Sequence, residues 1–416
     1  MLLNYLKIAW KVLLRRKFFT FISLFGISFT LMILLVVYAL FDHAVGARPP
    51  ELHTDRLLFI NRMILRGDGS MSSSGVGYSF LKQHVSTLRL PEKVSISEAY
   101  PISITLYVDQ QAVKADRRYT DGNLWQVLNF DFVAGRPYSV AEVRDAAHVV
   151  VLNETIARRC FGTATAAVGQ AVQVDGKPYR VVGVVRDVPT VRELTYAECW
   201  LPVTTTMADL RDPSYLGDYQ AIVLARQAAD VPVVQEEYQQ MLHRLPIPDP
   251  KQFQEIRSYA RTLLAHYMTN HNNDAGQDGD AAHFWRQWIG LGLLFMLLPA
   301  LNLININVSR TLERAAEIGV RKAFGATARR LVGQFLIENM LLTLLGGVLG
   351  LLLAAAVLAL INSSHFLPYA ELGLNARVFG VGLLLALVFG LLSGAYPAYK
   401  MSKLPANQAL KGAAAV

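Results

Sequence analysis

Cysteine is scarce in this sequence, with two residues, Cys160 and Cys199, among 416. So few cysteines exclude a disulfide-rich scaffold and a zinc cluster built on cysteine thiolates. The sequence also lacks a G-x-x-x-x-G-K-[ST] phosphate loop, a G-x-S-x-G nucleophile turn and an H-E-x-x-H zinc helix. We therefore expect no ATP hydrolysis by these residues alone, and a membrane-tethered hydrolase is disfavoured.

Two small groups of polar side chains remain to be interpreted. Cys160 and Cys199 either form a disulfide or stay isolated, and two isolated cysteines are the expected case. A loose cluster of histidines and aspartates matches no ligand spacing of a known metal site, so we interpret it as a solvated loop and predict no metal. Its members are His266, His271, Asp274, Asp278, Asp280 and His283.

Charged residues make up only 17% of the chain, and long runs contain almost none of them. A transmembrane helix needs roughly 20 mainly apolar residues, and four stretches meet that length: 18–41, 288–308, 331–366 and 378–399. We predict an α-helical membrane protein with four transmembrane helices and a large α+β extracytoplasmic domain between helices 1 and 2. The predicted segments are 1–17 (amphipathic cytoplasmic helix), 18–42 (helix 1), 43–283 (outer domain), 284–308 (helix 2), 309–330 (cytoplasmic coupling loop), 331–366 (helix 3), 367–376 (short outer loop), 377–400 (helix 4) and 401–416 (cytoplasmic tail).

The distribution of basic residues predicts the orientation. Segment 43–283 carries 24 Lys and Arg against 27 Asp and Glu, whereas the rest of the chain carries 16 against 5. Most of those 16 lie before helix 1, between helices 2 and 3, or after helix 4. Because basic loops stay cytoplasmic, both termini are predicted inside the cell. The net charge of +8 is therefore an orientation signal, and we predict no nucleic-acid partner.

The outer segment has the patterns of a folded domain. Alternating apolar residues over Val94–Val108 predict a strand. Residues 170–174 and 179–185 predict a hairpin, because Asp175-Gly176 favours a tight turn between them. The apolar run 148–152 leads to Asn153, a predicted N-cap for a helix ending near Phe161.

The loop at 309–330 carries the most specific pattern. Glu313 and Glu317 lie at helical spacing, Ile318 and Phe324 provide apolar anchors, and Gly325 favours a helix end. Such a helix can bind a cytoplasmic partner. The alternative is a basic loop that contacts lipid headgroups.

The sequence Glu317-Ile318-Gly319-Val320-Arg321-Lys322-Ala323-Phe324-Gly325-Ala326, followed by Gln334-Phe335-Leu336-Ile337-Glu338, resembles the signature of MacB/FtsX-like ABC transporter permeases. Three further segments are similar to that family: Leu6–Phe18, the outer-domain residues 149–189, and Pro397–Leu410. The predicted order of one span, an outer domain and three spans is also the family's.

The resemblance implies a noncatalytic subunit of the bacterial inner membrane with a MacB-like periplasmic domain. Its expected partners are a cytoplasmic ABC ATPase dimer, a second copy or a related permease, a periplasmic adaptor or substrate protein, and membrane lipid. ATP and magnesium are expected on the ATPase, so no cofactor is expected in this chain. ATP binding would close the helices and move the periplasmic domain, an arrangement called mechanotransmission. The implied ATPase-coupling residues are Glu317, Ile318, Gly319, Arg321, Lys322, Phe324, Gly325 and Ala326.

Two departures from the family pattern bear on the partners. Ala316 stands where members often have a basic residue, which puts one charge contact with the ATPase in question. Some members carry a fused N-terminal ATPase, whereas about 17 residues precede the first predicted span here, so a separate ATPase polypeptide is expected.

Two features inside the third predicted span are candidate functional positions. Glu338 is an intramembrane carboxylate, and its alternative is an interfacial residue that reaches headgroup water. Gly346, Gly347 and Gly350 suit close helix packing, either at a dimer face or inside one protomer.

The family resemblance leaves the process open among export, lipoprotein handling and activation of an envelope enzyme. The alternative function is a membrane-anchored periplasmic sensor or scaffold without ATP coupling.

Overall fold

The computed structural model describes residues 10–11, 13–15, 17–108, 111–269, 284–291, 294, 328–364, 367–373, 379–381, 383–384, 387–388 and 391. The chain divides into two compact units. We call residues 1–42, 285–366 and 371–416 the helix unit, and residues 43–284 and 367–370 the sheet unit. Most of the second and fourth predicted spans lies outside the described residues.

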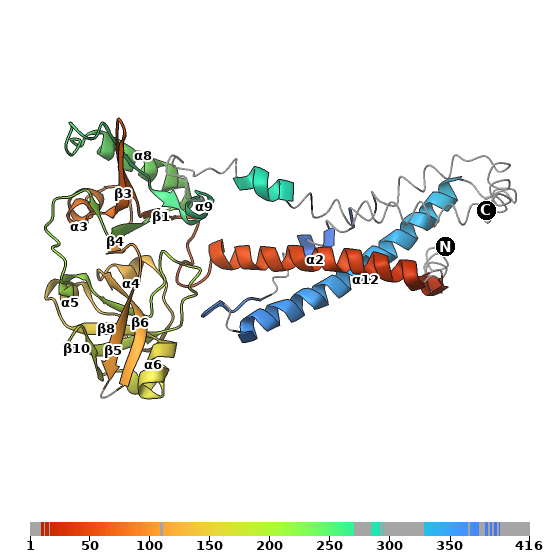
Figure 1. Ribbon diagram of the computed structural model, residues 1–416, viewed down its shortest axis with the longest axis horizontal. Helices are drawn as coiled ribbons and strands as arrows, with labels where there is room; N and C mark the ends of the chain where they lie inside the picture. The colour runs from red at the N-terminus through yellow and green to blue at the C-terminus, as the bar shows by residue number, and fades with distance from the viewer. Residues whose placement is uncertain are drawn as a thin grey trace. The chain divides into compact units, whose positions relative to one another are not determined.

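Two long helices dominate the described part of the helix unit (Figure 1). Helix α2 runs over Lys17–Val45 and α12 over Ala328–Ser364. Within them, Thr20–Val45 and Leu336–Ser364 are long and apolar enough to cross a membrane. Among the described residues these two are the candidate spans, and they coincide with the first and third predicted ones.

Helices α2 and α12 pack against each other in parallel. Ile27 and Leu31 share a buried cluster with Leu342, and further along both helices Leu35 packs with Ala354. Residue numbers therefore rise together along the contact, so the two helices run in the same direction.

The sheet unit is built on a fifteen-stranded mixed sheet. Its strands are β1 (Leu57–Ile60), β2 (Met63–Gly67), β3 (Ser70–Val76), β4 (Lys93–Glu98), β5 (Ile102–Val108), β6 (Gln111–Thr120), β7 (Phe132–Gly135), β8 (Val149–Asn153), β9 (Ala171–Val174), β10 (Lys177–Val185), β11 (Cys199–Pro202), β12 (Leu216–Gly217), β13 (Tyr219–Leu224), β14 (Glu255–Ser258) and β15 (Arg261–Thr262). The α-helices between and after them are α3 (Tyr78–Phe80), α4 (Leu124–Val127), α5 (Val140–Arg144), α6 (Glu154–Phe161), α7 (Ala164–Ala167), α8 (Val231–His243) and α9 (Leu263–Met268). The π-helix η1 (Leu81–Val85) and the 3₁₀ turns η2 (Val203–Thr205) and η3 (Ala228–Asp230) complete the unit.

The sheet has two parts joined at β6. Strands β6, β11, β8, β10, β9 and β5 pair in a closed circuit, with β8 parallel to β10 and β11 parallel to β6. Strand β4 pairs with β6 at one position and with β13 along its whole length, and so leads to β1, β3, β2 and β14. One apolar cluster extends through both parts, from Leu57 to Leu263.

Local sequence signals account for two predicted features of the closed circuit. In the β9–β10 hairpin, Asp175 and Gly176 have φ values of 50° and 77°, as a two-residue hairpin turn requires. At the end of β8, the side chain of Asn153 accepts a hydrogen bond from the Ile156 N–H at 2.9 Å and caps α6. Both predictions are confirmed.

The prediction of an alternating strand over Val94–Val108 is confirmed in part, because most of the segment is in strands. The segment forms two strands, β4 and β5, separated at residues 99–101, and Pro101 lacks the N–H that a continuous ladder would need. The last four residues of β4 are all buried, so side chains on both faces of this strand are shielded from solvent. Alternation therefore does not describe β4.

Candidate functional site

The predicted ATPase-coupling residues, 317–326, lie outside the residues that the structure describes. Glu338 is described: it is buried on α12, in the same turn as the buried Asn339. The role predicted for it stays a prediction.

The three glycines of α12 differ in their surroundings. A Cβ on Gly346 would lie 2.7 Å from Cγ2 of Ile27, and one on Gly350 would lie 2.8 Å from the backbone oxygen of Ser28. A Cβ on Gly347 would instead meet the end of the Leu383 side chain at 3.1 Å. Gly346 and Gly350 thus let α2 approach α12 inside one chain, whereas a dimer face at these glycines stays a prediction.

The loose histidine and aspartate cluster is described only at His266. The His266 ring bonds to Asn61 at 3.3 Å and to Glu193 at 2.8 Å. Among the described residues, no group of three or more acidic, histidine or cysteine side chains is arranged to hold a metal ion. Cys160 and Cys199 are both free, and Cys199 is buried.

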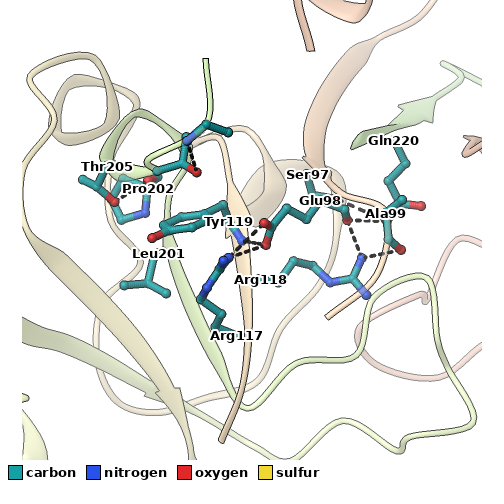
Figure 2. A network of polar contacts seen from close by, with 12 residues as sticks. Ser97, Glu98, Ala99, Arg117, Arg118, Tyr119, Leu201, Pro202, Thr205 and Gln220 are labelled. Atoms are coloured by element: carbon teal, nitrogen blue, oxygen red, sulfur yellow. Dashed lines mark hydrogen bonds and ion pairs between the residues drawn. The ribbon is translucent and has the colours of Figure 1, made fainter. Parts of the chain in front are cut away.

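A network of buried charges lies where β4 ends beside β6 (Figure 2). Arg117 Nη1 donates to both carboxylate oxygens of Glu98 at 2.9 Å, and the Tyr119 N–H donates to the same carboxylate at 2.8 Å. These two side chains are 13% and 7% exposed, so the pair is largely shielded from water. The Glu98 charge is thereby balanced in a position that otherwise disfavours ions.

Arg118 points away from that pair and reaches a second part of the chain. Burial lowers the pKa of Arg118 to about 10, which still leaves the guanidinium charged at neutral pH. It donates to five backbone carbonyls at 2.7–3.3 Å, those of Glu98, Ala99, Glu193, Leu194 and Tyr196. Gln220 on β13 also donates to the Leu194 carbonyl, at 2.6 Å. The loop around residue 194 is therefore fixed to two strands of the core.

We call residues 189–198 the junction segment, because further chain segments converge on it. Arg192 pairs with Glu51, and both side chains are fully buried. The same guanidinium donates to the carbonyls of His43 at 3.1 Å and Gly46 at 2.8 Å, and Thr195 donates to Glu51. His43 lies in the last turn of α2 and Gly46 follows its last residue, so the end of that helix is bonded to the junction segment.

Two more segments bind to the same loop. Tyr267 on α9 donates its hydroxyl to the Val191 carbonyl, and His266 bonds to Glu193. Tyr369, in the four residues 367–370 that belong to the sheet unit, donates to Glu198. The junction segment thus connects the ends of three chain segments to the core strands.

The chemistry of this arrangement is positional. Guanidinium groups, carboxylates and backbone carbonyls form strong directional hydrogen bonds but supply no activated nucleophile. We therefore regard the junction segment as a site that fixes chain segments in place.

Sequence reasoning missed the junction residues for a physical reason. Glu51 and Arg192 are 141 positions apart, and neither lies in a motif. The one local signal is Arg117-Arg118 within a strand, where two adjacent side chains must point to opposite faces. An arginine that must point into a core predicts buried acceptors but does not identify them.

Two family models match successive parts of the chain, and both describe permease regions. Residues 20–241 match the MacB-like periplasmic core domain, and residues 289–406 match the FtsX-like permease C-terminal region. The chain is 22% identical over 409 residues to the macrolide export ATP-binding/permease protein MacB of Salmonella paratyphi A, covering 97% of this chain. It is 24% identical over 417 residues, 98% of this chain, to the pyoverdine export ATP-binding/permease protein PvdT of Pseudomonas savastanoi pv. phaseolicola. The chain spans 60% and 59% of the lengths of these two relatives.

Two solved structures are similar to about half of the chain, with TM-scores below 0.4. The periplasmic region of MacB from Actinobacillus actinomycetemcomitans has a TM-score of 0.37 and 18% identity, covering 54% of this chain and 95% of that one. The extracellular domain of the ABC-type transporter YknZ from Gram-positive bacteria has a TM-score of 0.34 and 15% identity, covering 48% of this chain and 98% of that one.

Proposed function

Because the chain belongs to the family of ABC transporter permeases with a MacB-like periplasmic core domain and an FtsX-like C-terminal region, we propose that it couples ATP binding and hydrolysis on a cytoplasmic ATPase to movement of its periplasmic domain. This proposal rests on the attachment of the chain at the end of α2 to the junction segment. Through Arg192 and Glu51 it fixes the chain leaving α2 to strands of the core, with both charges fully buried. A displacement of the end of α2 is then transmitted to the sheet instead of being absorbed by a loop.

The packing of α2 and α12 supports the predicted membrane topology. Two parallel helices that both cross a membrane require the chain to return across it between them. The second predicted span, 288–308, provides that return. We therefore propose four spans in the inner membrane, with both termini in the cytoplasm and the sheet unit in the periplasm. The grouping of residues 367–370 with 43–284 supports this, since both then lie on the same side.

Nucleotide binding is proposed on a partner. No phosphate loop occurs in these 416 residues, so ATP and magnesium would be held by an ATPase dimer, which we propose to be a separate chain. It would bind this permease at Glu317–Ala326, with Ile318 and Phe324 as apolar anchors. A second permease, identical or related, would complete the membrane pair.

Export is the process that we propose to test first, because the relatives are named for export of macrolides and pyoverdine. A periplasmic adaptor would then be a further partner. Lipoprotein handling and activation of an envelope enzyme are the competing processes, and they would instead require a lipoprotein or an enzyme bound to the periplasmic domain.

The test is affinity purification of the full chain in mild detergent, followed by measurement of ATP hydrolysis. We expect an ATPase to be recovered with it, and we expect the double substitution Ile318→Asp and Gly325→Asp to abolish its recovery without reducing expression. Asn407→Asp, which adds one negative charge in the predicted cytoplasmic tail, is the matched control and should keep the ATPase. Recovery of no ATPase with the unaltered chain would favour a sensor or scaffold.

A further inference from the structure

The short segment after α12 is folded into the sheet unit, although the sequence alone predicts only a connecting loop there. Residues 367–370 form a turn in which the Ala370 N–H donates to the Leu367 carbonyl at 3.2 Å. The Tyr369 hydroxyl donates to Oε1 of Glu198, and its ring lies 6.3 Å from that of Tyr196. The Thr190 N–H approaches the Pro368 carbonyl at 3.5 Å. This small set of contacts attaches the segment to the junction segment.

Glu198 depends on that tyrosine for one of its oxygens. The side chain is largely buried, and its other oxygen accepts the Asp116 N–H at 2.9 Å. Among the residues that the structure describes, Glu198 has no ion-pair partner. Burial, and then the Glu198 carboxylate, raise the pKa of Tyr369 well above its usual range, so the hydroxyl remains a donor. A protonated hydroxyl beside a largely buried carboxylate forms a specific but single bond.

The attachment after α2 is much stronger than this one. Separating Arg192 from Glu51 would leave two fully buried charges without their partner, which is strongly unfavourable. Separating Tyr369 from Glu198 breaks one hydrogen bond between a half-buried tyrosine and a buried carboxylate that keeps its bond to the Asp116 N–H. Tyr369 also has φ of 62°, a left-handed conformation that is unfavourable for a residue with a Cβ atom.

The end of α12 is linked to this segment by a short closed loop. The Asn362 side chain donates to the Leu372 carbonyl at 2.9 Å and accepts the Leu372 N–H at 3.0 Å. These two bonds hold positions 362 and 372 together, so the residues between them cannot extend freely. A shift of the helix end is therefore passed to residues 367–370.

We propose that Tyr369 and Glu198 form a detachable latch, which is engaged in one nucleotide state of the transporter and released in the other. The latch rests on the proposed ATP coupling. In this arrangement the attachment after α2 stays fixed through the cycle, while residues 367–370 leave and rejoin the junction segment. Of the segments attached to the junction segment, residues 367–370 are then the switchable one.

The test measures engagement by disulfide trapping in the purified complex with its ATPase. Thr190→Cys and Pro368→Cys place thiols where the backbones already approach, in a chain whose native cysteines are replaced (Cys160→Ser, Cys199→Ala). We expect the rate of disulfide formation to differ at least about fivefold between nucleotide-free complex and complex trapped with ATP and vanadate. Adding Tyr369→Phe should lower the faster rate about tenfold, as loss of a charge-assisted hydrogen bond predicts.

Tyr196→Phe is the matched control. It removes the same hydroxyl from a tyrosine that donates to Asp116 at 2.9 Å in the same cluster, but it keeps the ring that lies beside Tyr369 and leaves the Tyr369–Glu198 bond intact. We expect it to leave the trapping rates unchanged. An equal effect of both substitutions would overturn the latch.

ATP hydrolysis measured in the same preparation separates the two proposals. A complex that hydrolyses ATP while trapping at one constant rate overturns the latch and leaves ATP coupling standing. Failure to recover any ATPase overturns both.

Discussion

The contact between α2 and α12 and the interior of the sheet unit are stabilised by different physical effects. The helix contact is made by aliphatic side chains and glycines, and the buried Ser28 hydroxyl bonds within its own helix, to the Phe25 carbonyl at 3.2 Å. The sheet unit instead buries whole ions, of which the Arg192 and Glu51 side chains are 0% exposed. Close packing of apolar surfaces therefore stabilises the helix contact, whereas the sheet unit also requires its buried charges to be balanced.

This difference suits the movement that we propose for the membrane helices. Aliphatic surfaces can slide or separate into lipid at moderate cost, because lipid chains replace the lost contacts. A buried ion pair cannot separate in this way, because no solvent follows the charges into the core. We thus expect changes of packing in the helix pair and rigid-body behaviour in the junction.

The largest effect is expected from breaking the buried pair in the sheet unit. Arg192→Met leaves Glu51 buried without its cation and should lower the free energy of unfolding by about 3–5 kcal/mol. Thermal unfolding of the full chain in detergent measures the change. The double variant Arg192→Met/Glu51→Gln should recover part of the loss, and Arg144→Met, an exposed arginine, should have no measurable effect. A loss no larger than that of Arg144→Met would show that burial of the pair does not matter.

In the helix pair, adding one methyl group where α2 and α12 are closely packed should destabilise the protein, although it changes no charge. Gly350→Ala places a Cβ 2.8 Å from the Ser28 backbone oxygen, which cannot yield, so we expect a loss of about 1–2 kcal/mol. Gly347→Ala meets only the end of Leu383 and gains up to about 1 kcal/mol of helix propensity, so it should be neutral or stabilising. Thermal unfolding of both variants in the same detergent decides the matter. Equal shifts would argue against close packing at Gly350.

A smaller effect should appear as a pH dependence confined to the sheet unit. Burial raises the pKa of Asp121 to about 6, although Ser95 and the Ile96 N–H donate to its carboxylate. Because the folded state holds this proton more tightly than the unfolded state, the contribution to stability is full below about pH 4 and is lost as pH rises through about 6. We expect Asp121→Asn to remove this dependence, because asparagine does not titrate. The unfolding midpoints of the unaltered protein and of Asp121→Asn, measured between pH 4 and 7, test this expectation. If both midpoints changed equally with pH, Asp121 would not be the source of the pH dependence.

The smallest effect is expected at an exposed ion pair of the sheet unit. Hydrogen bonds from Arg136 lower the pKa of Glu142 to about 2, and Ser139 adds to them. This contribution is present above about pH 4.5 and is lost as pH falls through about 2. Since Arg136 is 56% exposed, Arg136→Gln should cost less than about 1 kcal/mol at pH 7, and less still at high salt. Urea unfolding at two salt concentrations provides the check, and a salt-independent loss would contradict a screened pair.

Several elements could be read from short stretches of sequence. The Asp175-Gly176 turn, the Asn153 cap and the apolar runs of α2 and α12 each depend on the residues that form them. The prediction at Val94–Val108 found strand but missed the break at residues 99–101 and the burial of successive residues in β4. The family resemblance also came from local motifs, in particular Glu317–Ala326.

The sequence by itself determined the family, the two apolar helices found at the predicted first and third spans, and the local turns and caps. Each of these follows from hydrophobic length, φ preference or side-chain capping within a few residues. Only the tertiary structure decided that Arg192 meets Glu51, that Arg118 binds five carbonyls, and that Tyr369 folds back onto Glu198. Arg192 and Glu51 are 141 positions apart, and Tyr369 and Glu198 are 171 positions apart. Which charges meet at such separations depends on strand register and on the path of the chain.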